Sequence, residues 1–454
     1  MSRFSKLTDH RRGELFETRR AGSISILEHV QLLIALDQAF HQAFYKVIIM
    51  NPRVVIFLTV FIDLLGFGMV LPLLPIYAKQ FTVDESGWQL GALMASFSVM
   101  QFFFAPVWGR LSDRIGRRPV LLIGLAGSVV FYGLFGIATV MKSLTLLFVA
   151  RIGAGIAGAT IATAQAYIAD TTRVDQRARG MALIGLAFGM GFTFGPLLGF
   201  LAVPDRNAEP GPWPGYAAAL LSAVAFGLAV FVLPESLRPD SESATAHRAG
   251  FRHLGTVLAV PSIGAILAAM FIAIFSFANF ETTLSLLIKG SVPEVPFDFS
   301  WKMVCLTYAF IGLTLSLVQG GVVRRLAGRV SEGVLAGGGA VAEIGGLGLL
   351  IAATHWESIP LLFVGLAVVV SGFAFMQPNL NSLLSRRSDP RQQGMVLGMG
   401  QSVSSLSRIL GSALGIPLLF WSWFVPYVAG IGLMILGLLL VIVAARRGSD
   451  FPQA

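Results

Sequence analysis

The chain is poor in cysteine, in histidine and in charge. Its 454 residues include one cysteine, Cys305, which excludes an internal disulfide framework, a cysteine-based metal site and an iron–sulfur cluster. All six histidines lie in the N-terminal segment or in predicted loops, and no HExxH, Walker or Gly-x-Ser-x-Gly motif is present. We therefore expect no metal site, no cofactor and no enzymatic activity.

Charged residues make up 13% of the chain, against about 25% in soluble domains. The net charge of +9 is compatible with nucleic acid binding, but the basic residues stand in short clusters between apolar blocks, a pattern that indicates membrane topology instead. We expect a lipid bilayer as the surrounding medium and no nucleic acid partner.

Long apolar blocks fill the rest of the sequence, which is 55% apolar with a mean hydropathy of +0.76. A spanning helix needs about 20 mostly apolar residues to cross about 30 Å of hydrocarbon. The sequence predicts an all-α membrane protein of twelve transmembrane helices in two six-helix bundles. The predicted spans are 54–77, 90–111, 119–140, 144–169, 178–203, 214–234, 259–288, 302–323, 332–354, 359–384, 394–422 and 424–445.

The longest connection within the predicted bundles, 235–258, divides the spans six and six. Residues 1–50 precede the first span. They either form an amphipathic helix on the inner leaflet, or the protein begins at Met50 and the preceding residues are a mis-assigned start. The predicted organisation is an N-terminal extension (1–50), a first bundle (51–234), a central cytoplasmic loop (235–258), a second bundle (259–445) and a cytoplasmic tail (446–454).

Basic residues predict the orientation of these spans. With both termini inside, 26 of the 33 lysines and arginines fall in inner segments and five in outer loops. Because such an excess marks cytoplasmic segments, we expect a multi-pass protein of the inner or plasma membrane with both termini in the cytoplasm.

The two halves repeat weakly. Arg179-Gly180-Met181 in the fifth span matches Gln393-Gly394-Met395 in the eleventh, and the loop after the second span has a decayed counterpart after the eighth; both matches lie about 211–216 residues apart. Related halves predict a pseudo-twofold axis along the membrane normal, with a cavity between the bundles.

The loop between the second and third spans carries the sharpest motif, Gly109-Arg110-Leu111-Ser112-Asp113-Arg114-Ile115-Gly116-Arg117-Arg118-Pro119. Glycine at both ends permits a tight turn, and nearby arginines or a helix N-terminus can stabilise Asp113. Topological anchoring alone explains the arginines but not the order of the other residues.

This loop resembles the signature of the major facilitator superfamily. Asp63-Leu64-Leu65-Gly66-Phe67-Gly68 is similar to the first-helix motif of its twelve-span drug:H⁺ antiporters, especially the tetracycline-exporter-like branch. Arg151-Ile152-Gly153-Ala154-Gly155 and Leu233-Pro234-Glu235-Ser236 resemble its fourth-helix motif and its sixth-helix end. The resemblance covers about residues 50–445 and implies alternating access, with a small-molecule substrate and protons as the coupling ion.

The resemblance further implies a cytoplasmic charge cluster of Asp113, Arg117 and Asp170, with Asp113 facing the start of the eleventh helix near Gly394. Breaking that contact would accompany inward opening. The predicted gating residues are Gly109, Asp113, Arg114, Gly116, Arg117, Arg118 and Asp170.

The fifth span resembles the antiporter motif of the same family. Glycines at fourth positions allow close helix approach, and proline can kink the helix. Ordinary helix packing explains this pattern as well as a seal against leak does. The residues of the motif are Gly185, Gly189, Gly191, Gly195, Pro196 and Gly199.

Ionisable residues inside spans are costly, so they tend to face water or partners. Those present are Asp63, Arg151, Glu281, Glu343 and Arg408. Glu281 is the preferred protonation site, with a position near the outer mouth as the alternative. Asp63 either carries protons or is structural, by pairing with an arginine or capping a broken turn at Gly66 and Gly68. For Glu343, pairing with a polar neighbour is favoured.

The remaining candidates for the cavity are polar. Arg151 and Gln165, fourteen positions apart, would lie about 40° off one face of a continuous helix. Arg408 could neutralise an acid, and Asn279 could bind substrate or link helices. The predicted cavity set is therefore Asp63, Arg151, Gln165, Asn279, Glu281 and Arg408.

The favoured function is proton-coupled export of small, partly hydrophobic compounds by a monomer. An importer or exchanger of metabolites on the same scaffold is the alternative within transport, and a membrane receptor or sensor is the alternative outside it. Tetracycline exporters carry an acid in the third helix, but the predicted third span 119–140 has none. This departure counts against tetracycline itself as the substrate.

Overall fold

The computed structural model describes residues 52–81, 84–172, 177–203, 211–237, 261–292, 294–388 and 393–447. The predicted N-terminal helix, most of the central loop and the end of the tail lie outside these residues. Two compact units divide the chain, Met1–Val55 and Ile56–Ala454. Of the first unit only the start of one helix is described, and everything below concerns the second.

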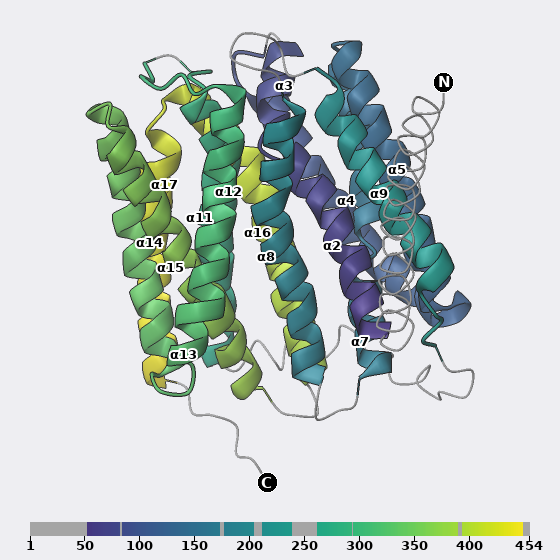
Figure 1. The fold of residues 1–454 in the computed structure, drawn as a ribbon. Coiled ribbons are helices and arrows are strands. Elements are labelled where there is room, and N and C mark those ends of the chain that lie inside the picture. The colour runs from purple at the N-terminus through teal and green to yellow at the C-terminus, as the bar shows by residue number, and fades with distance from the viewer. Residues whose placement is uncertain are drawn as a thin grey trace, which may run out of the picture. The chain divides into compact units, whose positions relative to one another are not determined.

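Twelve helices or helix pairs in the described residues are long and apolar enough to cross a membrane, which confirms the predicted number of spans. The first six spans are formed by α2 (Pro52–Val70) with α3 (Leu74–Phe81), α4 (Trp88–Ile115), α5 (Arg117–Val140), α6 (Leu144–Gly158) with α7 (Ile161–Thr171), α8 (Arg177–Ala202) and α9 (Trp213–Val232) (Figure 1).

The second six spans begin after the central loop. They are formed by α11 (Pro261–Ile288), α12 (Trp301–Leu317) with the π-helical segment η4 (Val318–Val323) and α13 (Arg324–Leu326), α14 (Glu332–His355), α15 (Ile359–Arg386), α16 (Gln393–Trp421) and α17 (Val425–Arg447).

Two of the predicted continuous spans are interrupted. The first breaks over 71–73, where Pro72 and Pro75 remove backbone donors, and not at Gly66 and Gly68, which lie inside α2. The fourth breaks between Gly158 and Ile161. Side chains of α4 satisfy carbonyl groups near the second break: Trp108 Nε1 donates to the carbonyl of Ile156 at 2.7 Å.

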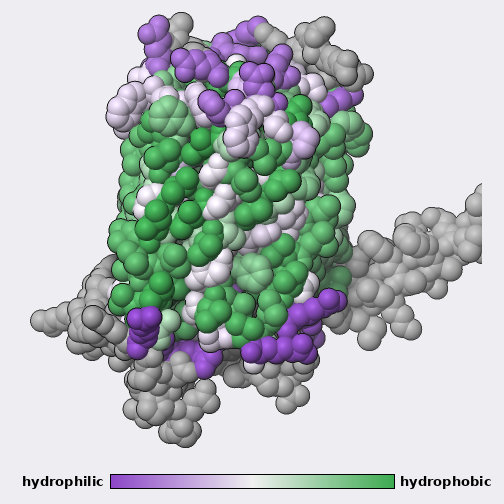
Figure 2. All heavy atoms as spheres, turned by 90° about the vertical axis from the view of Figure 1, so that its left-hand side faces the viewer, coloured by the Kyte–Doolittle hydropathy of each residue, from purple (hydrophilic) through white to green (hydrophobic). Residues whose placement is uncertain are grey.

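Helices pack into two groups that correspond to the two halves of the sequence. In the first, α5 packs against α6 and α9; in the second, α11 packs against α16 and α17, and α14 against α15. The groups meet through α4 with α16 and through α8 with α12. On the face in Figure 2, apolar side chains cover the middle and hydrophilic ones lie at both ends, as expected for a bilayer-spanning surface.

Candidate functional site

The predicted charge cluster is assembled around Arg117, the first residue of α5. Its Nη1 atom donates to Asp113 Oδ1 at 2.5 Å and to Ser112 Oγ at 2.7 Å, and its Nε atom donates to Asp170 Oδ2 at 3.0 Å. Arg117 is buried, whereas the Asp113 side chain is 53% exposed. The second, third and fourth spans are therefore joined at one end, which we call the motif end.

Glu235, which the sequence analysis placed only in a motif, is a further member of this cluster. Its carboxylate accepts the backbone N–H groups of Arg117 at 2.9 Å and Arg118 at 3.1 Å, so it caps the start of α5. It follows α9 directly, after Leu233-Pro234. In the sequence, the signal for this cap is an acid directly after the sixth span, on the same side of the membrane as the arginine-rich loop.

Gly116 makes this capping possible. Its backbone has φ 104° and ψ 157°, a conformation that side chains rarely adopt. A Cβ atom there would lie 2.5 Å from Glu235 Oε2. Gly109, at the other end of the motif, has open space within 4 Å of the place that a Cβ atom would take, and Arg114 is exposed. The side chains around Gly394, the expected partner of Asp113, lie outside the described residues.

The buried charges of the first bundle form a second site, deep in the spans. Asp63 of α2 accepts a hydrogen bond from Ser222 Oγ of α9 at 2.8 Å and has Ser128 of α5 as a second hydrogen-bonding neighbour. Tyr132 of α5 interacts electrostatically with both Asp63 and Arg151. Serine hydroxyls, rather than an arginine or a broken turn, are thus the direct partners of Asp63.

Arg151 is 5% exposed, and its guanidinium lies 4.6 Å from the centre of the Phe97 ring. Its Nε atom has no hydrogen-bond partner among the described residues. Gln165, by contrast, is exposed on α7. Arg151 on α6 and Gln165 on α7 therefore differ in burial and lie on either side of the break after Gly158.

Glu281 and Arg408 are the corresponding charges of the second bundle. Glu281 on α11 is partly exposed and interacts electrostatically with Arg408 on α16, which is exposed. The Tyr308 hydroxyl donates to the Glu281 backbone carbonyl at 2.6 Å. Charges within spans tend to face water or polar partners, so Glu281, seven residues before the end of α11, and Arg408 remain candidates for a cavity wall.

Two other polar residues of the second bundle are buried. Asn279 is 1% exposed and links two helices, because its Nδ2 atom donates to the carbonyl of Pro426 on α17 at 3.0 Å. Glu343 on α14 is fully buried near Ser276 of α11, and neither of its carboxylate oxygens has a hydrogen-bond partner among the described residues.

Glycines of α8 pack against helices of both bundles. A Cβ atom at Gly195 would lie 2.8 Å from the backbone of Gly68 in α2, and one at Gly199 would lie 3.4 Å from Cys305 Sγ in α12. Gly191 faces Leu64 of α2, and Gly189 faces Ser316 of α12. Pro196 lies within the helix. Gly185, nearer the motif end, is exposed and has nothing within 4 Å.

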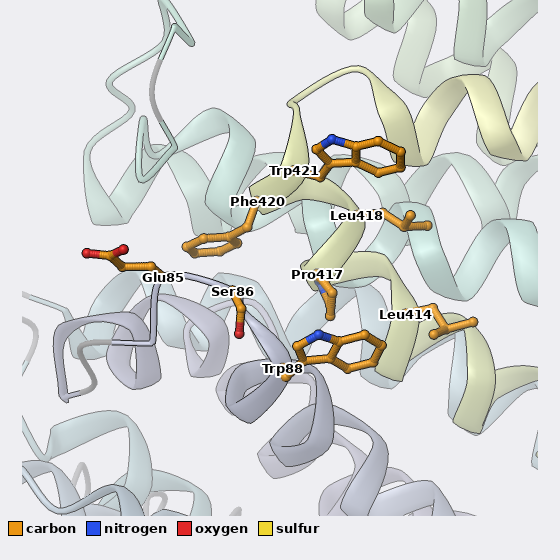
Figure 3. A pocket seen from close by; sticks show the side chains of 8 residues that line it. All are labelled: Glu85, Ser86, Trp88, Leu414, Pro417, Leu418, Phe420 and Trp421. Carbon is orange, nitrogen blue, oxygen red and sulfur yellow. The ribbon is translucent and has the colours of Figure 1, made fainter.

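The two bundles touch at the end opposite the motif. There Gly87 and Gly91, at the start of α4, lie against Ile416 and Ala413 of α16. A pocket of about 440 Å³ lies at this junction. Figure 3 shows Trp88 beside Pro417 and Leu414, with the Glu85 carboxylate pointing away from them.

Nearer the motif end no such close approach is seen at the corresponding glycines. Gly109 of α4, Gly185 of α8 and Gly398 of α16 have nothing within 4 Å of a Cβ position, and Gln401 of α16 is exposed.

Two helical bundles that touch at one end, span a membrane and carry charges inside their spans define the class of secondary transporters. The chain belongs to the Major Facilitator Superfamily, whose family model matches residues 56–412. Both the predicted fold class and the predicted family are confirmed. The family and the fold are those of transporters, not of enzymes.

Relatives support the predicted branch. The class C tetracycline resistance protein of Escherichia coli is 32% identical over 368 residues, which cover 80% of this chain and 88% of that protein. Major facilitator superfamily domain-containing protein 10 of Mus musculus is 30% identical over 409 residues, covering 79% and 85%. The crystal structure of the human organic anion transporter MFSD10 (TETRAN) matches with a TM-score of 0.64 and 27% identity, covering 86% of this chain and 98% of that one.

Proposed function

We propose that this protein is a proton-coupled antiporter that exports small, partly hydrophobic compounds across the inner or plasma membrane. The motif end, where the basic loops gather, faces the cytoplasm in this proposal, and the junction of Gly91 with Ala413 lies toward the opposite side. The observation that carries the proposal is the partly exposed Glu281 beside the exposed Arg408, within the spans of a chain related to tetracycline resistance proteins.

Coupling follows from competition for a carboxyl group. A substrate that needs the ionised form of Glu281 or Asp63 cannot bind while that group holds a proton, so one site carries either species but not both. Arg408 supplies an opposite charge that interacts electrostatically with Glu281. Outward release of the substrate then leaves the carboxyl group free to return with a proton.

Transport of organic anions is the second candidate function. It is favoured by the exposed guanidinium of Arg408 and by the similarity to a structure described as an organic anion transporter. An anion bound at Arg408 would favour protonated Glu281, because two negative charges would otherwise share the site. That arrangement moves the anion and the proton in the same direction, so the two candidates predict opposite proton fluxes.

Proton movement in proteoliposomes tests both candidates. The wild type is assayed with tetracycline, cationic dyes and organic anions, beside Glu281→Gln and Asp63→Asn. Export that is driven by an inward proton gradient and lost in Glu281→Gln supports the antiporter. If both variants exchange protons for substrate at the wild-type rate, these carboxyl groups do not couple transport.

A further inference from the structure

Lysine side chains lie over aromatic rings at the end of the molecule where the two bundles touch. We call this end, opposite the motif end, the junction end. Lys79 Nζ, in the last turn of α3, lies 4.2 Å from the centre of the ring of Phe420, in the last turn of α16 (Figure 3). Lys302 Nζ, in the first turn of α12, lies 5.2 Å from the centre of the Phe200 ring near the end of α8. Each contact joins one bundle to the other.

Close approach of helices accompanies each of these contacts. A Cβ atom at Gly87, before α4, would lie 2.9 Å from Phe420 Cδ2, so two segments of the first bundle, Gly87 and Lys79, touch this ring. On α8, a Cβ atom at Gly199 would lie 3.4 Å from Cys305 Sγ of α12. All four side chains of the two lysine–ring pairs are half-buried. Partial loss of hydration strengthens the attraction between an ammonium group and a ring.

Helix polarity does not explain the position of Lys302. The first turn of a helix carries a partial positive charge, so α12 repels a lysine that stands there. The face of an aromatic ring is negative and attracts an ammonium group, so Phe200 is a partner that offsets this repulsion. The two rings come from the fifth and eleventh spans, which correspond through the internal repeat, whereas the lysines come from the first and eighth spans.

We propose that Lys79 and Lys302, through their contacts with Phe420 and Phe200, are positioning residues that hold the two bundles together at the junction end. When the bundles separate there, each ammonium group passes into water and each ring needs no polar partner, so no buried charge is left behind. Contacts of this kind change an equilibrium by about two- to fivefold each. The two lysines act on the movement of the bundles and not on the cargo or the coupling ion, so their role does not depend on drug export.

Cys305 supplies a reporter of separation at the junction end. It is the single cysteine of the chain, it is fully buried, and its Sγ atom lies at the contact between α8 and α12. Separation of these helices exposes the thiol, so the rate at which a maleimide labels the purified protein in detergent rises with the fraction of molecules in which they are apart.

Removal of each charge tests the proposal. Lys79→Met and Lys302→Met keep most of the length of the side chain, and each should raise the labelling rate about two- to fivefold. Lys79→Met is the decisive variant, because Lys79 and Phe420 lie on other helices than Cys305. Lys79→Arg should label at nearly the wild-type rate, since a guanidinium group also binds the face of a ring.

The electronic character of the ring separates this contact from ordinary packing. Trifluorophenylalanine in place of Phe420 keeps the shape of the side chain nearly unchanged but withdraws electron density from the ring face. The labelling rate should rise as it does in Lys79→Met, and fluorination in the Lys79→Met background should add nothing.

Lys289→Met is the matched control. Lys289 Nζ lies 5.9 Å from the centre of the Trp301 ring, and both residues belong to the second bundle, so loss of this charge should leave the labelling rate unchanged. A wild-type rate in Lys79→Met, or a rise on fluorination that persists in Lys79→Met, would overturn the role of Lys79. An equal rise in Lys289→Met would do the same, because it would assign the effect to charge alone. The labelling assay needs neither cargo nor a proton gradient, so failure of the export proposal leaves its result intact.

Discussion

The substitution Gly116→Ala tests whether the start of α5 depends on one backbone conformation. At φ 104° and ψ 157° this residue lies in a region that is essentially restricted to glycine, and other residues there cost about 1–3 kcal/mol. The added methyl group would also displace the Glu235 carboxylate, and loss of such a cap costs about 0.5–2 kcal/mol. Together the expected loss of folding free energy is about 1.5–5 kcal/mol.

Gly109→Ala is the matched control within the same motif. Gly109 lies inside α4 with nothing within 4 Å of a Cβ position, so alanine should be neutral or stabilise the helix by up to about 1 kcal/mol. Unfolding of both variants in detergent, induced by heat or denaturant, measures the difference in their folding free energy. A second variant, Gly116→Ala with Glu235→Ala, should be only slightly less stable than Gly116→Ala alone, because the cap is already lost. Equal stability of the two glycine variants would refute this account of the loop.

Three further predictions concern other parts of the chain. Asp113→Asn should abolish transport while membrane insertion stays normal; unchanged transport by a well-expressed variant would remove the gating role. Asn279→Ala should lower detergent stability by about 0.5–1.5 kcal/mol, because the buried hydrogen bond to the Pro426 carbonyl is lost. Gln165→Ala should slow transport at unchanged stability, and melting curves with transport assays separate the two. Desolvation acts to raise the pKa of Asp84, but hydrogen bonds to its carboxylate outweigh it and hold that pKa below its ordinary value. The contribution of Asp84 to stability is therefore present at neutral pH and is lost as the pH falls through the lowered pKa. Asp84→Asn should flatten the acid side of a plot of stability against pH.

Sequence patterns predicted the parts of this molecule that depend on composition and short motifs. The twelve spans follow from hydropathy, and the meeting of Arg117 with Asp113 and Asp170 agrees with what the family resemblance implied. Arg117, Asp113 and Asp170 lie at or near helix ends on the same side of the membrane, so the order of the spans already brings them close together.

Long-range relations were harder to predict, for identifiable physical reasons. A rotation of 100° per residue holds for an unbroken helix, and α6 and α7 are interrupted between Gly158 and Ile161, so the angle between Arg151 and Gln165 does not follow from their spacing alone. Asn279 could face water or a neighbouring helix at the same hydropathy, and only packing against α17 decides between them. The ion pair of Glu332 with Arg386 could not be predicted from identity between the halves, because its charges are reversed relative to the pair of Arg117 with Asp170.

The presence of Asp63 with Arg151 in one bundle, and of Glu281 with Arg408 in the other, has an electrical consequence. Each elementary charge that crosses the field costs about 2.3 kcal/mol per 100 mV of membrane potential. Because each of these acids shares its bundle with a base, tilting the bundle displaces opposite charges together, so that the protein's own charges contribute little net current while both acids are ionised. Membrane voltage should therefore act on the protein mainly through the proton and the cargo that it carries.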